Sequence, residues 1–449
     1  MSGSGAEHWE GGWGPSFEPA ARAVLGALRS GDLVEGTPYD TVALAGRFDV
    51  SLPTVRRALD RLGDTGLVDV GADDTVRFTR LSRAEWTESS QQLLAWLESA
   101  VRTAVPVLDD AAVERYRALV TTARTAAAHR DPALDPSFFD TVRFWAGATP
   151  NRLMARQLTR SLERLRFGPG VVVPWTVWDS EGWFAGSLRA AIDRDADAAS
   201  RAAHTLTRLW DGYLATADVE WTVEDTGRAP TWGRWDRDDL WYDVLGAVRD
   251  GTFTRSQTYG VREVAARFRT SPTELRPVLR RLELLGLVAS EDSDEHATVR
   301  ITDPDVHDWI EAEQSLQAIH EACARWAIPG LDDDARTTLA ALVQRAHRES
   351  TTRDYAFTAT MLGFTQFYAA HVPNRYLRAS AGLTIGRLAY ILEHPPQFRQ
   401  WDVEGYLAAV RTAAADRTPA SAVEVGHGLD RQIESHIADV AARYESMEA

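Results

Sequence analysis

Apolar residues recur at intervals of three and four along most of the 449-residue chain, and this pattern predicts a mainly helical protein. Residues 67–70 and 75–78 are instead short, rich in β-branched residues and separated by a polar turn, which predicts a β-hairpin. One of the clearest helical stripes contains Ala199, Ala203, Leu206, Trp210 and Tyr213.

The pattern and many of its residues occur twice. Val24-Leu25-Gly26-Ala27 recurs as Val244-Leu245-Gly246-Ala247, at an offset of 220 residues. After the hairpin the offset is 223, and it relates Pro150-Asn151-Arg152 to Pro373-Asn374-Arg375. One register held over about 180 residues predicts a tandem duplication of a unit of about 220 residues.

Within each unit, a helix, a tight turn and a second helix precede the hairpin. Ser51 is a natural N-cap for the second helix, which we expect over 54–62, with Gly66 at its end. Val55, Leu59 and Leu62 give that helix one buried face. This order of elements predicts a winged helix-turn-helix, whose second helix is suited to the major groove of DNA. About six helices should follow in each unit and form a bundle.

These elements divide the chain into six expected segments. They are a flexible tail at 1–17, a winged helix at 18–80, a helical bundle at 81–214, a linker at 215–236, a second winged helix at 237–302 and a second bundle at 303–449.

The first winged-helix region contains Leu44-Ala45, Val50-Ser51, Val55-Arg56, Ala58-Leu59 and Gly66-Leu67-Val68. With these residues it resembles the winged helix of GntR-type transcription regulators, and the helical part resembles the FCD ligand-binding domain of that family. The resemblance covers nearly the whole chain, twice. It implies that duplex DNA and a small organic effector or substrate are partners. Because the family acts as homodimers, it also implies an intramolecular pseudo-dimer, and it leaves open a homodimer of the chain.

The residues that would read DNA differ between the two copies. We expect contacts from Ser51, Thr54, Arg56, Arg57, Arg276 and Arg280. The family usually has an arginine where this chain has Leu52. In the second copy Glu274 would face phosphate, and Pro277 removes a backbone donor inside the helix. We therefore expect the first copy to bind DNA and the second to be impaired.

The metal site that the resemblance implies is missing from both copies. FCD domains commonly hold a metal with one Asp and three His. Only His204 and His427 remain, because the other ligand positions carry Phe138, Val142 and Gly182 in the first copy and Met361, Thr365 and Gly405 in the second. A single imidazole does not hold zinc, so we predict no metal and no cofactor.

Aromatic residues gather where the metal pocket should be, and they allow two interpretations. They either fill the space that the metal left, or they form the wall of a pocket for an organic ligand. His204 and His427 are likewise either half-buried helix residues or polar anchors in that pocket. The candidate ligand-binding residues are Trp145, Asn151, Trp178, Trp183, His204, Asn374, Trp401, Tyr406 and His427.

Composition narrows the class of protein. The chain has 65 acidic and 49 basic residues, a net charge of −16, which argues against non-specific binding to nucleic acid. One cysteine, Cys323, excludes an internal disulfide. No apolar run is long enough for a membrane helix and no signal peptide is recognisable, so we expect a cytoplasmic protein with no membrane partner.

The function that these observations favour is a ligand-responsive, DNA-binding transcription regulator with a metal-free effector pocket. We find no phosphate-binding loop and no motif of a nucleophilic or zinc hydrolase, and we assign no catalytic residue. The alternative is a repurposed scaffold with vestigial winged helices, acting as a small-molecule binder or an enzyme. Whether the scaffold has acquired catalysis stays open.

Overall fold

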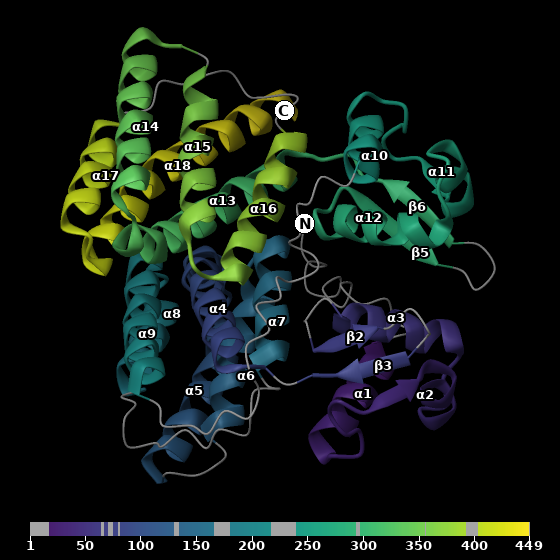
Figure 1. The fold of residues 1–449 in the computed structure, drawn as a ribbon. Coiled ribbons are helices and arrows are strands. Elements are labelled where there is room, and N and C mark those ends of the chain that lie inside the picture. Colours follow the sequence, from purple (N-terminus) through teal and green to yellow (C-terminus); the bar gives the residue numbers. More distant parts are fainter. Residues whose placement is uncertain are drawn as a thin grey trace. The chain divides into compact units, whose positions relative to one another are not determined.

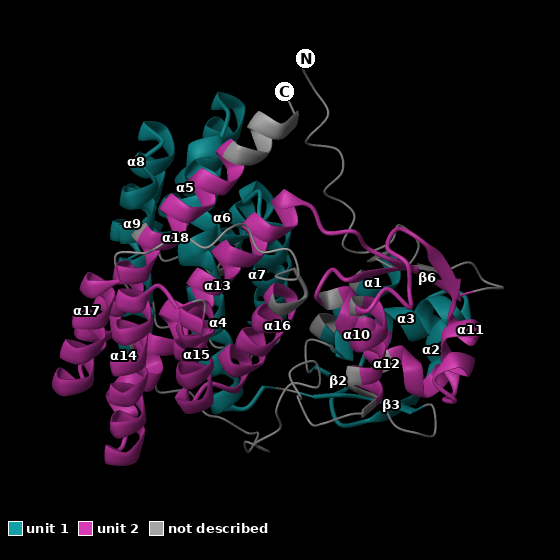
Figure 2. Ribbon diagram, turned by 90° about the horizontal axis from the view of Figure 1, so that it is seen from above, with its two compact units in different colours: residues 1–231 teal, residues 232–449 magenta. Residues whose placement is uncertain are grey.

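The structure is a computed structural model, and it divides into two compact units, Met1–Thr231 and Trp232–Ala449 (Figures 1 and 2). The predicted tail at 1–17 and most of the predicted linker lie outside the described residues. Those residues are 18–63, 67–70, 75–79, 81–129, 134–165, 180–216, 239–292, 297–354, 356–391 and 403–448. Over them the protein is mainly helical, with little sheet, as the apolar spacing predicts.

The first unit opens with a small domain that we call the first head, residues 18–78. Its elements are α1 (Glu18–Ser30), β1 (Pro38–Asp40), α2 (Thr41–Arg47), α3 (Leu52–Gly63), β2 (Val68–Val70) and β3 (Thr75–Phe78). The strands pair antiparallel in the order β1-β3-β2. The sheet and the helices enclose a core that includes Val24, Leu44, Val55, Leu59, Val76 and Phe78. The predicted hairpin is therefore confirmed, although Gly66 and the turn at 71–74 lie outside the described residues.

The second head, residues 239–301, has the same order of elements. They are α10 (Asp239–Arg249), β4 (Thr258–Gly260), α11 (Val261–Arg267), α12 (Pro272–Leu284), β5 (Val288–Asp292) and β6 (Ala297–Ile301), with the strands in the order β4-β6-β5. Equivalent hydrogen bonds brace both heads. The Tyr39 hydroxyl accepts from the Val34 N–H at 2.7 Å, and the Tyr259 hydroxyl accepts from the Thr254 N–H at 2.8 Å.

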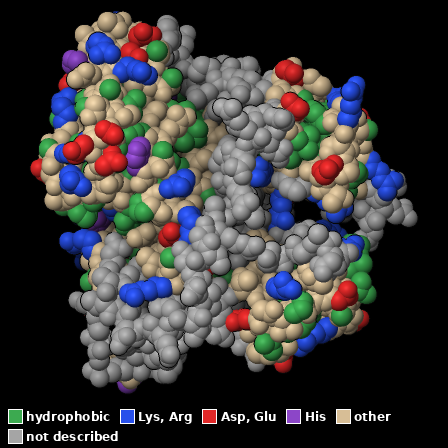
Figure 3. Space-filling view, viewed as in Figure 1, with side chains coloured by type: hydrophobic (Ala, Val, Ile, Leu, Met, Phe, Trp, Pro, Cys, Tyr) green, Lys and Arg blue, Asp and Glu red, His purple; other side chains and the backbone are tan. Residues whose placement is uncertain are grey.

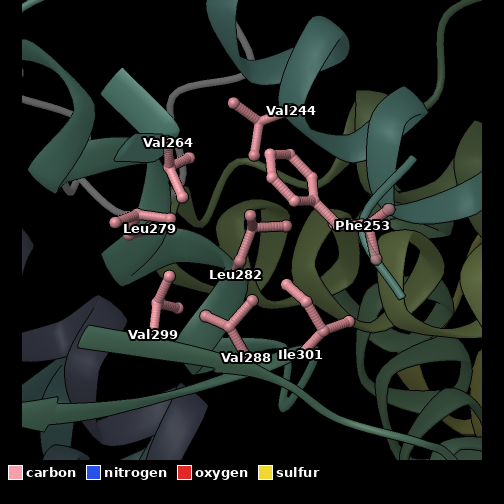
Figure 4. Close-up of a pocket in the computed structure, with 9 residues that line it drawn as sticks. Val244, Phe253, Val264, Leu279, Leu282, Val288, Val299 and Ile301 are labelled. Atoms are coloured by element: carbon pink, nitrogen blue, oxygen red, sulfur yellow. The ribbon is translucent and has the colours of Figure 1, made fainter. Parts of the chain in front are cut away.

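The second head contains a small cavity in its core (Figure 4). Its lining is entirely apolar and includes Val244, Phe253, Leu282 and Ile301. The volume is only about 10 Å³, the size that a single water requires. The cavity is therefore a packing void of the core and is too small for an organic ligand.

The first bundle follows the first head. It consists of α4 (Arg83–Ala104), the short 3₁₀ turn η2 (Val105–Val107), α5 (Asp110–His129), α6 (Leu134–Ala148), α7 (Arg152–Leu165), α8 (Glu181–Asp193) and α9 (Ala196–Thr216). A capping box starts α4, in which Ser82 and Glu85 each bond the backbone of the other. This helix is buried over most of its length and packs against α6, α7 and α9.

The second bundle repeats this order. It consists of α13 (Val306–Ala327), η4 (Ile328–Gly330), α14 (Asp333–Thr352), α15 (Ala356–His371), α16 (Arg375–Ile391), α17 (Glu404–Asp416) and α18 (Pro419–Glu448). Helix α13 takes the place of α4 and packs against α15, α16 and α18. The described residues thus form six α-helices in each bundle, the number that the sequence predicts. No helix among them is both long and apolar enough to span a membrane.

Candidate DNA interface and ligand pocket

Helix α3 has the local features of a recognition helix. Asp49 adopts a left-handed backbone, with φ of 53°, and turns the chain between α2 and α3. The Ser51 hydroxyl accepts from the Thr54 N–H at 3.3 Å and lies 2.8 Å from the Thr54 hydroxyl, which confirms the predicted N-cap. The helix begins at Leu52, two residues before the predicted start.

The two faces of α3 differ in exposure. Val55, Leu59 and Leu62 are buried against the rest of the head. Arg56 is exposed and Arg57 is half-buried. The arrangement leaves the N-terminal half of α3 with polar and cationic side chains on its outer side, where a recognition helix meets base edges and phosphates.

Helix α12 is the counterpart of α3 in the second head. The helix runs unbroken from Pro272 to Leu284, through Pro277. The donor that Pro277 lacks would have bonded the carbonyl of Thr273, in the first turn, so the loss falls close to the helix start. Arg276 on this helix is exposed and Arg280 is half-buried. The missing donor leaves the helix continuous, and impaired DNA binding by the second copy stays a prediction.

The Glu274 carboxylate turns back onto the start of the helix, a contact that the sequence analysis did not predict. Oε2 accepts from the Ser271 N–H at 3.0 Å and from the hydroxyls of Ser271 at 2.9 Å and Thr270 at 2.8 Å. The backbone bond from Ser271, followed by the two hydroxyl bonds, lowers the pKa of Glu274. The side chain is therefore an ionised acceptor fixed at the start of α12.

The interior of the first bundle is filled by aromatic side chains. Trp145 and Trp183 are fully buried, on α6 and α8. Tyr116 of α5 links these two helices, because its ring lies 4.5 Å from the ring of Trp145 and its hydroxyl lies 2.7 Å from that of Ser187. Burial raises the pKa of Tyr116, so this hydroxyl stays neutral.

The interior of the second bundle holds a polar cluster that the sequence interpretation missed, which we call the His320 cluster. His320 is fully buried. Its Nδ1 lies 2.8 Å from the Thr365 hydroxyl and its Nε2 lies 3.2 Å from the Tyr406 hydroxyl. The ring of Tyr368 packs edge-on at 5.2 Å. Burial lowers the pKa of His320 to about 3, so the imidazole is neutral and donates from only one nitrogen.

The positions that correspond to this cluster in the first bundle are apolar. At the offset of 223, His320, Thr365, Tyr368 and Tyr406 match Leu97, Val142, Trp145 and Trp183. The two bundles therefore place different chemistry at the same sites of one fold. A lone histidine in a buried helical stripe was the only sequence signal, and it is weak because many such histidines are ordinary core residues.

The two candidate asparagines serve as helix caps. The Asn151 carboxamide oxygen accepts from the Met154 N–H at 3.0 Å at the start of α7. The Asn374 oxygen accepts from the Leu377 N–H at 2.9 Å at the start of α16. Both residues are buried, so they fix where these helices begin.

The remaining candidates do not join the His320 cluster. His204 is half-buried, with its Nδ1 3.8 Å from the buried carboxylate of Glu98. His427 is exposed, 3.8 Å from Glu424. Trp178 and Trp401 lie outside the described residues. Cys323 is buried, and burial raises the pKa of its thiol to about 12, which argues against a nucleophile.

The described residues on one face of the molecule carry charges of both signs (Figure 3). On the face shown in Figure 3, acidic and basic side chains are interspersed over the described part of the molecule. Within the described residues, no three His, Cys, Asp or Glu side chains group in a way that could hold a metal ion.

Comparison with known proteins gives matches in structure only. No protein-family model matches the chain, and no curated protein matches its sequence. The match to E. coli McbR/YncC has 13% sequence identity and a TM-score of 0.31, and it covers 46% of this chain and 97% of the McbR/YncC chain. Streptococcus agalactiae GntR is 16% identical and covers 43% of this chain and 99% of its own, with a TM-score of 0.25. A GntR-family transcriptional regulator from Pseudomonas syringae pv. tomato str. DC3000 is 18% identical and covers 46% of this chain and 86% of its own, with a TM-score of 0.25.

Proposed function

We propose that the chain is a transcription regulator of GntR/FCD type, which binds duplex DNA through its heads and a small organic effector in a bundle. The main support for this proposal is the structure of α3. It is a capped helix, buried along one side, that follows a tight turn and presents Thr54, Arg56 and Arg57 at its outer, N-terminal half. Helices of this kind enter the major groove, where arginine binds guanine edges and phosphates.

The repeated order of elements supports a tandem duplication. In this proposal each unit is one winged helix with one FCD-like bundle, the segments are those expected from the sequence, and the chain is an intramolecular pseudo-dimer. A single chain then carries both reading heads of a family that otherwise acts as a homodimer.

The effector pocket is proposed to work without a metal. Within either bundle such a pocket would open among side chains that are now packed together. These are Trp145 and Trp183 in the first bundle, which would give apolar walls, and Tyr406 in the second, which would give a hydroxyl. Apolar walls with a few polar groups suit a small organic molecule.

Selection of the full chain against random duplex DNA, at about physiological salt, tests the DNA-binding proposal. We expect one motif to be enriched. Arg56→Ala should weaken the binding of this motif by roughly 5- to 150-fold and relax the preference at one position, since a base contact of this kind is worth about 1–3 kcal/mol.

Arg117→Ala is the matched control. It removes the same charge from an exposed position on α5, beside Glu114 at 3.3 Å, and should leave the motif and the affinity unchanged. If a well-folded wild-type chain enriches no motif, the regulator proposal fails.

The His320 cluster supports a second candidate function, a small-molecule binder or enzyme whose heads do not bind DNA. Buried hydroxyls and an imidazole in a bundle interior are groups that could orient a bound ligand. Quenching of intrinsic tryptophan fluorescence by members of a metabolite library, in a chain that enriches no DNA, would favour this function.

A further inference from the structure

The two candidate recognition helices have the same buried side and different outer sides. The buried positions Val55, Leu59 and Leu62 of α3 match Leu275, Leu279 and Leu282 of α12, all of them apolar. The packing of each helix within its head is therefore preserved.

The two helices differ in sequence at several positions between the buried ones. Thr54 matches Glu274, Arg57 matches Pro277 and Asp60 matches Arg280, while Arg56 and Arg276 are the same residue. Both helices keep cations, yet at partly different places along the helix. A pair of heads with these surfaces cannot offer the same donors and acceptors to two identical half-sites.

Glu274 is the most informative of these differences. Its Oε2 takes the three hydrogen bonds from Thr270 and Ser271. No hydrogen bond to Oε1 is formed within the described part of the chain, and the residue is exposed. Three bonds to one oxygen fix the side chain, and the other oxygen of this exposed residue keeps its capacity to accept a hydrogen bond.

Resting on the proposed function, we propose that the two heads read different half-sites, and that Glu274 gives the second half-site a preference for cytosine. Cytosine is the base that offers an amino donor, N4, without a neighbouring acceptor in the major groove, and carboxylates accept from it. A carboxylate disfavours guanine and thymine at this position, because both present acceptors there.

Cations on the same helix make a carboxylate tolerable beside DNA. Arg276 is exposed and forms no ion pair or hydrogen bond within the described residues. Arg280 lies one turn further along α12, half-buried, with its Nη2 buried. Arg276 can face a phosphate, which offsets the repulsion between the carboxylate and the backbone of the DNA. Thr54, the counterpart in α3, has a hydroxyl that both donates and accepts, so the first head lacks this preference.

Glu274→Gln separates base reading from capping. Glutamine at the third position of a helix preserves a capping box, so the start of α12 stays intact. Its amide donates as well as accepts, and glutamine pairs with adenine. Selection on the variant should therefore show cytosine replaced by adenine at one position of the second half-site. The wild type should bind a site with adenine at this position about tenfold more weakly than a site with cytosine. The variant should bind the adenine site more tightly than the cytosine site.

Arg56→Ala provides the complementary comparison, because it should relax the first half-site and leave the cytosine preference intact. Two outcomes overturn the inference: a motif with two identical halves, and a Glu274→Gln variant that binds all sequences more tightly with no change in base preference. The second outcome would make Glu274 a repulsive group only. Failure of the proposed function itself is distinguishable, because the wild type would then enrich no motif.

Discussion

At the scale of single residues, His320 shows how one side chain changes the character of a bundle. The imidazole is fully buried and bonds Thr365 and Tyr406. In the first bundle, leucine takes the position of His320 and valine takes the position of Thr365. Removing one partner of a buried hydrogen bond leaves the other group unsatisfied, and this costs more stability than replacing both partners by apolar groups. The cluster should therefore respond to substitution as a unit.

His320→Leu should lower the free energy of unfolding by about 1–3 kcal/mol, because it leaves the hydroxyls of Thr365 and Tyr406 without a buried partner. Adding Thr365→Val, which copies the first bundle further, should recover part of the loss. Urea unfolding of the wild type and both variants measures this. If the double variant loses the sum of two independent penalties, the cluster is not a coupled network.

The same residue predicts acid sensitivity. The pKa of His320 is about 3 in the folded chain and about 6.5 when exposed, so between these values only the unfolded chain binds the proton. The stabilising effect of His320 is therefore lost as the pH falls from about 6.5 toward 3. Tyr368 and Tyr406, the titratable groups beside it, have raised pKa values and stay neutral in this range.

The buried residue Glu313 changes the stability of the protein with pH in the opposite direction to His320. Burial raises its pKa to about 7, so it adds stability at low pH that is lost as the pH rises from about 4.5 to about 7. The difference between the wild type and the double variant, measured by urea unfolding at several pH values, isolates His320. A constant difference from pH 7 to pH 4 would contradict the buried, neutral imidazole.

At the scale of elements, α16 joins the second head to its bundle. Tyr376, Ala379 and Leu383 of this helix belong to the hydrophobic core of the head. Arg387, also on α16, bonds Glu311 at 3.1 Å and lies against Gly286 at the end of α12. In the first unit, Arg156 and Arg160 of α7 occupy the positions that match Ala379 and Leu383. The second head therefore shares an apolar core with α16, and the corresponding positions of α7 are cationic.

Leu383→Ala should destabilise the second head by about 2–5 kcal/mol, because Leu383 is buried and its loss leaves a cavity. Hydrogen exchange should show faster exchange in α12, β5 and β6. Leu388→Ala is the matched control on the same helix, since Leu388 is as buried but packs on Ala312 and Leu316 of the bundle. Equal exchange in the head for both variants would refute a specific role for Leu383.

Local pattern was sufficient to predict the elements but not their partners. The spacing of Val55, Leu59 and Leu62, with Ser51 before them, locates α3 because capping and one-sided burial are local properties. The hydrogen bonds from Ser271 to Glu274 are also local, but the charge of Glu274 alone does not indicate that its carboxylate caps the helix. The His320 cluster joins residues from three helices, and no local pattern specifies such a contact.

At the scale of the whole molecule, charge limits how the protein can hold DNA. The chain carries a net charge of −16, and residues 21–80 and 240–301 have nearly balanced charges. In the proposed regulator, binding then depends on a few cations of α3 and α12. Among the candidates these are Arg56, Arg57, Arg276 and Arg280. A regulator built in this way recognises its site mainly through base contacts and binds other DNA poorly.

The salt dependence of binding tests this balance. If four arginines each neutralise one phosphate, the slope of log K against log salt concentration should be about −4 or shallower, since each contact contributes about −0.9. Anisotropy of a labelled operator between about 50 and 300 mM salt measures the slope, and Arg276→Ala should reduce its magnitude by about one. Arg117→Ala should leave it unchanged. A slope steeper than about −6 would require basic surfaces beyond the two helices, and the assignment of DNA binding to α3 and α12 alone would then be wrong.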